Sequence, residues 1–376
     1  MGGVPLNKVQ SGLGWLAGKT MPIKKNKIVV TSYYGRGFSD SPKAIVEALL
    51  DSGKELDIVW LTKEPTEVPE GVRCVEYDSA ARMTELSTAK IWSDNCRKGA
   101  KYKKDGQIYM QVWHGFALKQ IEKDVVDKIP DPNYENYAIR DSQQTDLIVS
   151  NSRHMTRVYR ESFWYDGEVL EFGSPRNDIF FKENGWVRTK VHQALGIPED
   201  VNIVLYAPTF RVTQSLEPYT MDSHAVCEAL GKRFGGKWVF VTRLHPNVAK
   251  LSDQLPYEDA VDATSYDDIQ ELLVSADALI SDYSSVVFDY MLSQKPCFMY
   301  ATDIEEYKND RNFYIPLDEM PFPIAVNNKT FIDNIENFDD NTYRNSIRAF
   351  ADKYGMIDDG SASRRCADWI LSKMEA

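Results

Sequence analysis

The sequence lacks the features of membrane, secreted and zinc-binding proteins. No segment of its 376 residues is long and apolar enough to span a membrane, and no cleavable signal peptide is apparent. The cysteines are scattered and form no CxxC pair; they are Cys74, Cys96, Cys227, Cys297 and Cys366. This pattern argues against a disulfide framework or a zinc site and favours a reducing compartment. We therefore expect a cytoplasmic protein.

Several common catalytic motifs are also missing. The chain contains no HExxH spacing, no GxSxG elbow and no P-loop lysine motif. It also contains no DxD pair, which argues against a nucleotide diphosphate held by a metal ion.

The net charge of −12 makes extensive nucleic-acid binding improbable, so a phosphate ligand has to be held by local cations or backbone amides. Hydrophobic residues make up 43% of the chain and charged residues 27%, as in globular proteins. The length suggests two domains of ordinary size.

The start of the chain differs from the rest because residues 1–39 contain no acidic side chain. Leu6, Val9, Leu13 and Leu16 fall at helical spacing, and the lysines at 24, 25 and 27 follow them. Residues 1–24 therefore form a candidate amphipathic segment for an anionic membrane surface. The alternative is a tail that packs on the body of the protein or stays disordered.

Short apolar runs alternate with helical segments, which is typical of parallel βαβ units. Strands are expected at 27–33, 57–61, 73–77, 89–93, 107–113, 147–150, 169–173, 202–207, 238–244, 278–280 and 297–300. Helices are expected at 41–50, 269–275, 286–292, 343–354 and 363–374. We predict an N-terminal domain at 25–184 and a C-terminal domain at 185–376 that includes both closing helices.

The most informative stretch runs from Ala278 to Tyr300 and reads as strand, polar loop, helix and strand. Ser284 and Ser285 stand at the predicted helix start, where backbone amides without internal partners and the helix dipole favour an anion. The alternative is that one of these serines only caps the helix.

Other polar residues also follow predicted strands. His114, Arg211 and His245 each come just after an apolar run, so an open sheet would place them at its carboxyl edge. The histidines at 154, 192 and 224 have no such placement, and we expect no functional role for them.

Six segments together resemble a known family. They are WHGFALKQIEKD (113–124), FGSPRND (172–178), LYAPTFR (205–211), TRLHPN (242–247), SDYSSVVFDYMLSQKPCFMY (281–300) and DIEEYKNDRNFY (303–314). In this order they resemble the CDP-glycerol:poly(glycerophosphate) glycerophosphotransferases of teichoic acid and capsule synthesis. The resemblance implies a GT-B arrangement, in which two Rossmann-like α/β domains face a cleft.

The resemblance also implies a reaction. Glycerol phosphate would pass from CDP-glycerol to a hydroxyl of an undecaprenyl-diphosphate-linked disaccharide, with release of CMP and no required metal. His114 matches the family's proposed base, and His245 its RxHP histidine, which could bind or protonate the leaving phosphate. The remaining candidates for CDP-glycerol binding are Arg211, Arg243, Ser284, Ser285 and Asp289.

The sequence departs from the family next to the proposed base, because Phe116-Ala117 replaces the usual Thr-Pro. Alternative activities are a glycerol or ribitol phosphate polymerase and a GT-B glycosyltransferase that uses a nucleotide-sugar. A non-catalytic membrane-associated scaffold is a further alternative. A lipid-linked acceptor would fit a peripheral protein on the inner face of the membrane, held through residues 1–24.

Overall fold

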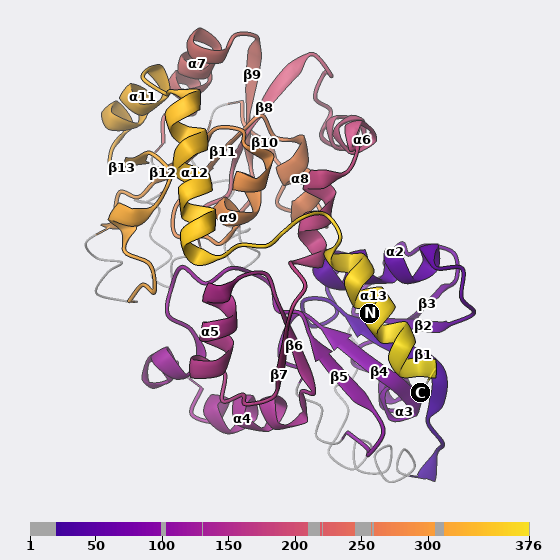
Figure 1. Ribbon diagram of the computed structural model, residues 1–376. Coiled ribbons are helices and arrows are strands. Elements are labelled where there is room, and N and C mark those ends of the chain that lie inside the picture. Colours follow the sequence, from indigo (N-terminus) through magenta and orange to yellow (C-terminus); the bar gives the residue numbers. More distant parts are fainter. Residues whose placement is uncertain are drawn as a thin grey trace. The chain divides into compact units, whose positions relative to one another are not determined.

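The computed structural model describes residues 20–98, 103–129, 131–209, 219, 221–244, 257, 259–304 and 312–375. They form two α/β units, each built on a parallel sheet (Figure 1). The first unit contains the described residues of Met1–His114, Ile121–Phe181 and Met356–Ala376. The second contains those of Gly115–Gln120 and Lys182–Gly355.

The first unit has a seven-stranded sheet in the order β3-β2-β1-β4-β5-β6-β7. Its strands are β1 (Lys24–Thr31), β2 (Asp57–Thr62), β3 (Val72–Glu76), β4 (Ala89–Asp94), β5 (Ile108–Gln111), β6 (Leu147–Ser150) and β7 (Glu168–Glu171). In β1, Ile28 and Val30 join one apolar cluster and Val29 joins another. Both faces of this strand are therefore covered, which explains its continuous apolar run.

Helices and short 3-10 segments connect these strands. They are α2 (Asp40–Asp51), α3 (Ala80–Thr88), η1 (Glu122–Lys128), α4 (Tyr134–Gln144), α5 (Arg153–Ser162), η2 (Pro175–Phe181) and, at the end of the chain, α13 (Ala362–Glu375).

The position of α13 corrects the predicted domain division. The sequence assigned 185–376 to the C-terminal domain, but α13 packs beside α2 in the first unit (Figure 1). Cys366, Ala367 and Ile370 are buried in the same cluster as Ile28 of β1. An amphipathic pattern shows that a helix has an apolar face, but it does not identify the sheet that this face covers.

The second unit repeats the architecture with a six-stranded sheet in the order β10-β9-β8-β11-β12-β13. Its strands are β8 (Val201–Tyr206), β9 (Lys237–Thr242), β10 (Val261–Asp262), β11 (Ala278–Ser281), β12 (Cys297–Tyr300) and β13 (Ile324–Ala325). Its helical segments are α6 (Gly185–Leu195), α7 (Ser223–Phe234), α8 (Ile269–Ser275), α9 (Val286–Tyr290), η5 (Met291–Ser293), η6 (Leu317–Glu319), α11 (Asn328–Glu336) and α12 (Asp340–Tyr354).

The sequence predicted the longer strands of both sheets, usually within a few residues of their ends. It missed β10 and β13, which have two residues each and carry little apolar pattern. The predicted helix at 286–292 is α9 followed by the 3-10 turn η5. Its residues 287–291 are all buried.

Asp178 links η2 to the start of α13. Its carboxylate accepts hydrogen bonds from the Ala362 amide at 3.0 Å, the Ser363 amide at 2.8 Å and the Ser363 hydroxyl at 2.5 Å. Asp178 is 3% exposed, so loss of this carboxylate would leave buried helix-end amides without an acceptor.

We predict that Asp178→Ala lowers the free energy of unfolding by about 2 kcal/mol, the upper range for an N-terminal helix cap. Urea unfolding followed by circular dichroism measures this change. The matched control is Asp368→Ala, because Asp368 forms only an exposed pair with Arg364 on the same helix and should change stability by less than about 0.5 kcal/mol. Equal unfolding curves for both variants would contradict the proposed anchoring of α13.

Candidate active site

Each sheet has a point at which the strand order reverses direction. In the first unit this point lies between β1 and β4, and in the second between β8 and β11. Open parallel sheets bind ligands outside the carboxyl ends of their strands at such points. The loops after these four strands are therefore the places to look for functional side chains.

His114 lies just after β5, which is the neighbour of β4. The preceding Trp113 has a left-handed φ of 47°. Its amide donates to the side-chain oxygen of Gln111 at 2.8 Å. The Trp113 ring stacks on the His114 ring, with 4.4 Å between centroids and 29° between planes. These contacts fix the orientation of the His114 imidazole.

A hydrogen bond identifies the nitrogen of His114 that carries the proton. Nδ1 lies 2.6 Å from the backbone oxygen of Asn95. A carbonyl oxygen can only accept, so Nδ1 is the donor and Nε2 holds a lone pair in the neutral ring. Burial lowers the pKa of His114 below its ordinary value of 6.5, although the Asn95 carbonyl and the Asp40 carboxylate oppose this effect. The ring is therefore neutral near pH 7 and suited to accept a proton.

Asn95 is held in turn by the loop that follows β1. Its side-chain oxygen accepts from the Tyr33 amide at 2.8 Å. The Tyr33 hydroxyl donates to Asp40 at 2.7 Å, and Asp40 forms a 2.9 Å ion pair with Arg176. Burial alone would raise the pKa of Asp40, but Arg176 and the bond from Tyr33 hold it below the usual range. Asp40 therefore stays ionised, and the network extends from β4 to η2.

Two buried cations stabilise the segment that carries Asn95. Arg97 pairs with Glu122 at 2.6 Å and with Asp141 at 3.4 Å. Lys98 pairs with Asp94 at 3.0 Å, and burial lowers the pKa of Lys98. Removal of one member of such a pair leaves an uncompensated buried charge, which is strongly destabilising. These pairs therefore restrict movement of the backbone around Asn95.

The backbone is strained around the same imidazole. Left-handed φ angles occur at Tyr33 (43°), Tyr34 (59°) and Asp40 (65°), in addition to Trp113. Such angles are uncommon for residues other than glycine, and clusters of them accompany functional sites. Sequence reasoning identified His114 but missed Tyr33, Asp40 and Asn95, because the bonds that join them connect residues far apart in the chain.

The residues after His114 belong to the second unit. Phe116 is 2% exposed, and its ring lies 4.5 Å from that of Phe288 in α9. The Gln120 amide donates to the Asn312 carbonyl at 2.9 Å. Phe116 stands where Thr is usual in the family named above, and its side chain is larger than that of Thr. It belongs to an aromatic cluster that also contains Phe350 of α12.

In the second unit, a buried carboxylate joins the loops after β8 and β11. Asp282, which is 2% exposed, accepts from the Thr209 amide at 2.8 Å and the Thr209 hydroxyl at 2.5 Å. The Ser281 hydroxyl donates to the Ala207 carbonyl at 2.6 Å. Asp282 was not predicted as a site residue, although a carboxylate directly after an apolar strand was a usable signal.

Three of the predicted donor-binding residues, Ser284, Ser285 and Asp289, follow β11 in the chain. Ser284 accepts from the Val286 amide at 3.4 Å, and Ser285 is the N-cap of α9 without a side-chain capping bond. Asp289 is 3% exposed and accepts from the Gln270 amide group at 3.2 Å. The capping alternative thus fits Ser284 only in part and does not fit Ser285.

Arg243 directly follows β9. Its Nη1 donates to the backbone carbonyls of Ala263 at 3.0 Å, Thr264 at 3.3 Å and Tyr266. These bonds hold the Arg243 guanidinium on the segment that follows β10. His245 itself and Arg211 lie outside the described residues.

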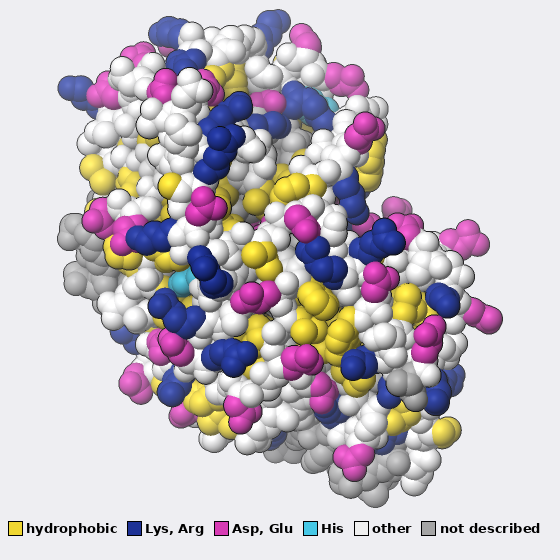
Figure 2. Space-filling model, viewed as in Figure 1, with side chains coloured by type: hydrophobic (Ala, Val, Ile, Leu, Met, Phe, Trp, Pro, Cys, Tyr) yellow, Lys and Arg dark blue, Asp and Glu magenta, His cyan; other side chains and the backbone are white. Residues whose placement is uncertain are grey.

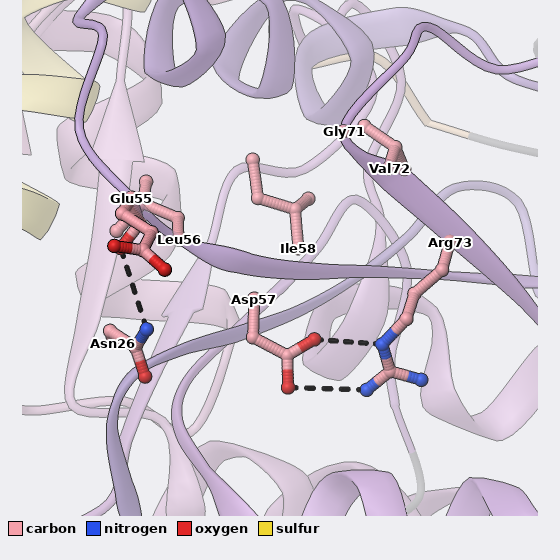
Figure 3. A pocket seen from close by; sticks show the side chains of 8 residues that line it. All are labelled: Asn26, Glu55, Leu56, Asp57, Ile58, Gly71, Val72 and Arg73. Carbon is pink, nitrogen blue, oxygen red and sulfur yellow. Dashed lines mark hydrogen bonds and ion pairs between the residues drawn. The ribbon is translucent and has the colours of Figure 1, made fainter.

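A pocket of about 460 Å³ lies at the opposite end of the first sheet, where β2 and β3 begin (Figure 3). Two of its charged lining residues pair with each other, because Arg73 bonds Asp57 at 2.7 Å. In the described part of the chain, no group of three or more His, Cys, Asp or Glu side chains is placed to hold a metal ion. The same residues contain no helix long and apolar enough to cross a membrane.

Comparisons with known proteins agree with the predicted resemblance. Residues 17–372 match the model of the CDP-Glycerol:Poly(glycerophosphate) glycerophosphotransferase family. A teichoic acid glycerol-phosphate transferase of Staphylococcus aureus is 32% identical over 365 residues, which cover 92% of this chain and 93% of the relative. A teichoic acid poly(glycerol phosphate) polymerase of Staphylococcus epidermidis is also 32% identical, over 94% of this chain but only 52% of the relative.

The chain spans about half the length of this polymerase and of a second one, from Bacillus subtilis. Among solved structures, the wall teichoic acid polymerase TagF matches with a TM-score of 0.87 and 31% identity, over 97% of this chain and 93% of that chain. Another TagF structure, of a variant soaked with CDPG, matches with a TM-score of 0.86. The predicted α/β fold of two Rossmann-like units is confirmed, and the chain belongs to the CDP-glycerol:poly(glycerophosphate) glycerophosphotransferase family.

Proposed function

We propose that the protein transfers glycerol phosphate from CDP-glycerol to a hydroxyl of a lipid-linked, undecaprenyl-diphosphate disaccharide and releases CMP. The observation that supports a transferase most directly is the His114 imidazole, whose Nδ1 donates to Asn95 and whose Nε2 holds a lone pair. Family membership supports the donor class, and the Staphylococcus aureus glycerol-phosphate transferase is similar over nearly its whole length.

In the proposed reaction, Nε2 of His114 takes the proton of the acceptor hydroxyl as its oxygen attacks the phosphorus that carries glycerol. The bond from that phosphorus to the bridging oxygen breaks, and CMP leaves with the electron pair. His245 binds or protonates the leaving phosphate. Arg211, Arg243, Ser284 and Ser285 hold the donor phosphates.

Asp289 differs from the other proposed donor-binding residues, because its buried carboxylate already accepts a hydrogen bond from the Gln270 side chain. Its proposed role is to bind a hydroxyl of the donor. No metal or cofactor is needed in this scheme, because cationic side chains, hydroxyls and backbone amides stabilise the negative charge of the phosphates.

A second candidate function is polymerisation, in which glycerol or ribitol phosphate units are added repeatedly. The resemblance to TagF and to the two polymerases favours this alternative. The two functions share the chemical step. They differ because a polymerase uses the product of one transfer as the acceptor of the next.

We predict that His114→Ala lowers kcat by about a hundredfold to ten-thousandfold, the usual contribution of a general base, while the fold is preserved. The measurement is CMP release from CDP-glycerol with a synthetic lipid-diphosphate disaccharide, together with circular dichroism of the variant. The matched control is His224→Ala, because His224 is exposed in the second unit and should leave kcat unchanged. A folded His114→Ala enzyme with normal turnover would refute the assignment of the base.

The pH dependence follows from the lowered pKa of His114. Protonation removes the lone pair, so kcat/KM should fall as the pH drops through the pKa of the folded protein. Because burial depresses that pKa, we predict an acid limb with its midpoint below pH 6.5 and a plateau at neutral pH. An initial-rate profile between pH 5 and 8 locates the midpoint, and a midpoint above pH 6.5 would contradict the proposed electrostatics.

The acceptor proposed above is a lipid, so we also propose that the protein is a peripheral protein at the inner face of the cytoplasmic membrane, in contact through residues 1–24. Residues 1–19 of this predicted segment lie outside the described part of the structure. Lys24 and Lys25, which begin β1, are exposed. On the viewed face of the molecule, Lys and Arg alternate with Asp and Glu (Figure 2).

We predict that removal of residues 1–19 abolishes binding to liposomes with anionic lipids but preserves turnover of a soluble acceptor analogue. This deletion leaves β1 intact. In the full-length chain, Lys24→Gln with Lys25→Gln should weaken liposome binding by about tenfold or more. Co-sedimentation measures both effects, and unchanged binding after the deletion would refute the role of the segment.

A further inference from the structure

Tyr33 contacts the surroundings of the proposed base in two ways, although the reaction scheme gives it no role. Its ring meets the His114 ring edge-to-face, with 5.9 Å between centroids and 61° between planes. Its backbone amide donates to the side-chain oxygen of Asn95 at 2.8 Å, and the backbone oxygen of Asn95 lies 2.6 Å from Nδ1 of His114. Tyr33 therefore touches the imidazole and also holds the residue that fixes the imidazole proton.

Both contacts depend on an unfavourable backbone conformation. Tyr33 has a φ of 43°, a left-handed angle that is uncommon for a bulky side chain. Such an angle costs free energy and persists only where surrounding contacts enforce it. A contact at the far end of the Tyr33 side chain therefore bears on the position of its backbone amide.

The hydroxyl of Tyr33 provides such a contact, because it donates to the Asp40 carboxylate at 2.7 Å. Burial and the charge of Asp40 raise the pKa of Tyr33 well above its ordinary value, so the hydroxyl keeps its proton and acts as the donor. Asp40 is 2% exposed and forms a 2.9 Å ion pair with Arg176, which is 6% exposed. A hydrogen bond to an ionised group is stronger than one between neutral groups.

The same contacts give a place to an arginine that the reaction scheme does not use. Arg176 belongs to the segment FGSPRND (172–178), one of the six that carry the family resemblance. From Arg176 the contacts continue through Asp40 and Tyr33 to the residue that holds the base, and all of these residues belong to the first unit. They end at Nδ1 of His114, the nitrogen that does not receive the acceptor proton in the proposed reaction.

We propose that Tyr33 is a positioning residue for the proposed base and that its hydroxyl bond to the Asp40–Arg176 pair is required for this role. The bond keeps the Tyr33 amide on Asn95, and Asn95 keeps the proton on Nδ1 of His114, so that the lone pair stays on Nε2. In this role Tyr33 does not contact the reacting atoms. The inference rests on the proposed function and deepens it.

Tyr33→Phe tests this role, because it removes the hydroxyl and keeps the ring beside His114. Asp40 retains its pair with Arg176 and the bond from the Ser41 amide at 2.6 Å, so we expect the variant to fold, as circular dichroism can verify. In assays of CMP release, we expect kcat to fall by about tenfold or more, because a displaced base impairs the chemical step. The KM for CDP-glycerol should stay within about twofold of the wild type, because donor binding is not affected.

The matched control is Tyr165→Phe, which removes a hydroxyl that donates to the Glu168 carbonyl at 2.8 Å. This bond lies at the start of β7, whereas His114 follows the end of β5 in the same parallel sheet. The control variant loses a tyrosine hydroxyl bond of similar length at the opposite edge of the sheet, so its kcat should equal that of the wild type.

A second measurement needs no turnover. Nuclear magnetic resonance of the full-length protein with nitrogen-labelled histidine distinguishes the two neutral tautomers, and the signals lost in His114→Ala belong to His114. At neutral pH the wild type should show the Nδ1–H tautomer of His114, because Nδ1 donates to Asn95. Tyr33→Phe should show a mixture of both tautomers, and Tyr165→Phe should match the wild type.

Wild-type kcat in Tyr33→Phe, an unchanged His114 tautomer in that variant, or an equal loss of kcat in Tyr165→Phe would each overturn the proposal. If the wild type releases no CMP, the proposed reaction fails. The tautomer of His114 in Tyr33→Phe then still decides whether Tyr33 positions the ring, so the two claims fail separately.

Discussion

The hydrogen bond from Nδ1 of His114 to the backbone carbonyl of Asn95 is the constraint on which the account of the first unit depends. It leaves Nε2 as the nitrogen that can accept a proton, and burial keeps the ring neutral. The Asn95 carbonyl can hold the proton on Nδ1 of His114 only if its own position is fixed. The Tyr33 amide holds the Asn95 side chain, and buried ion pairs of Arg97 hold the segment that follows. Left-handed backbone angles in the same loops show that the surrounding contacts outweigh local conformational preference.

The sequence was sufficient for the elements whose pattern is local. The strands Leu147–Ser150 and Cys297–Tyr300 and the helix Ile269–Ser275 have the predicted bounds, because each is a short apolar segment between clear turn or capping signals. It was not sufficient for relations between distant segments. The final helix was assigned to the wrong unit, since its apolar face shows that it packs but does not identify its partner. The bonds that hold Asn95 were missed for the same reason.

The two units share one feature of sheet topology but place different chemical groups at it. Each places polar side chains after the strands at which the order of its sheet reverses, as open α/β sheets do. In the first unit these loops hold a neutral imidazole. In the second unit, Asp282 joins the loops after β8 and β11, near the serines that precede α9. Resemblance located these motifs, and the structure adds the buried carboxylates that support them. Because the chain spans about half of two related polymerases, the resemblance alone does not distinguish single transfer from repeated transfer.

Mass spectrometry of the acceptor after reaction with CDP-glycerol tests the central claim most directly. Purified protein is incubated with CDP-glycerol and a synthetic lipid-diphosphate disaccharide, and CMP is quantified in the same samples. We predict one added glycerol phosphate per acceptor and one CMP per addition. A ladder of additions would identify a polymerase and contradict the single-transfer proposal. An unmodified acceptor with no CMP, also when ribitol donors and other acceptors are supplied, would contradict the transferase function itself.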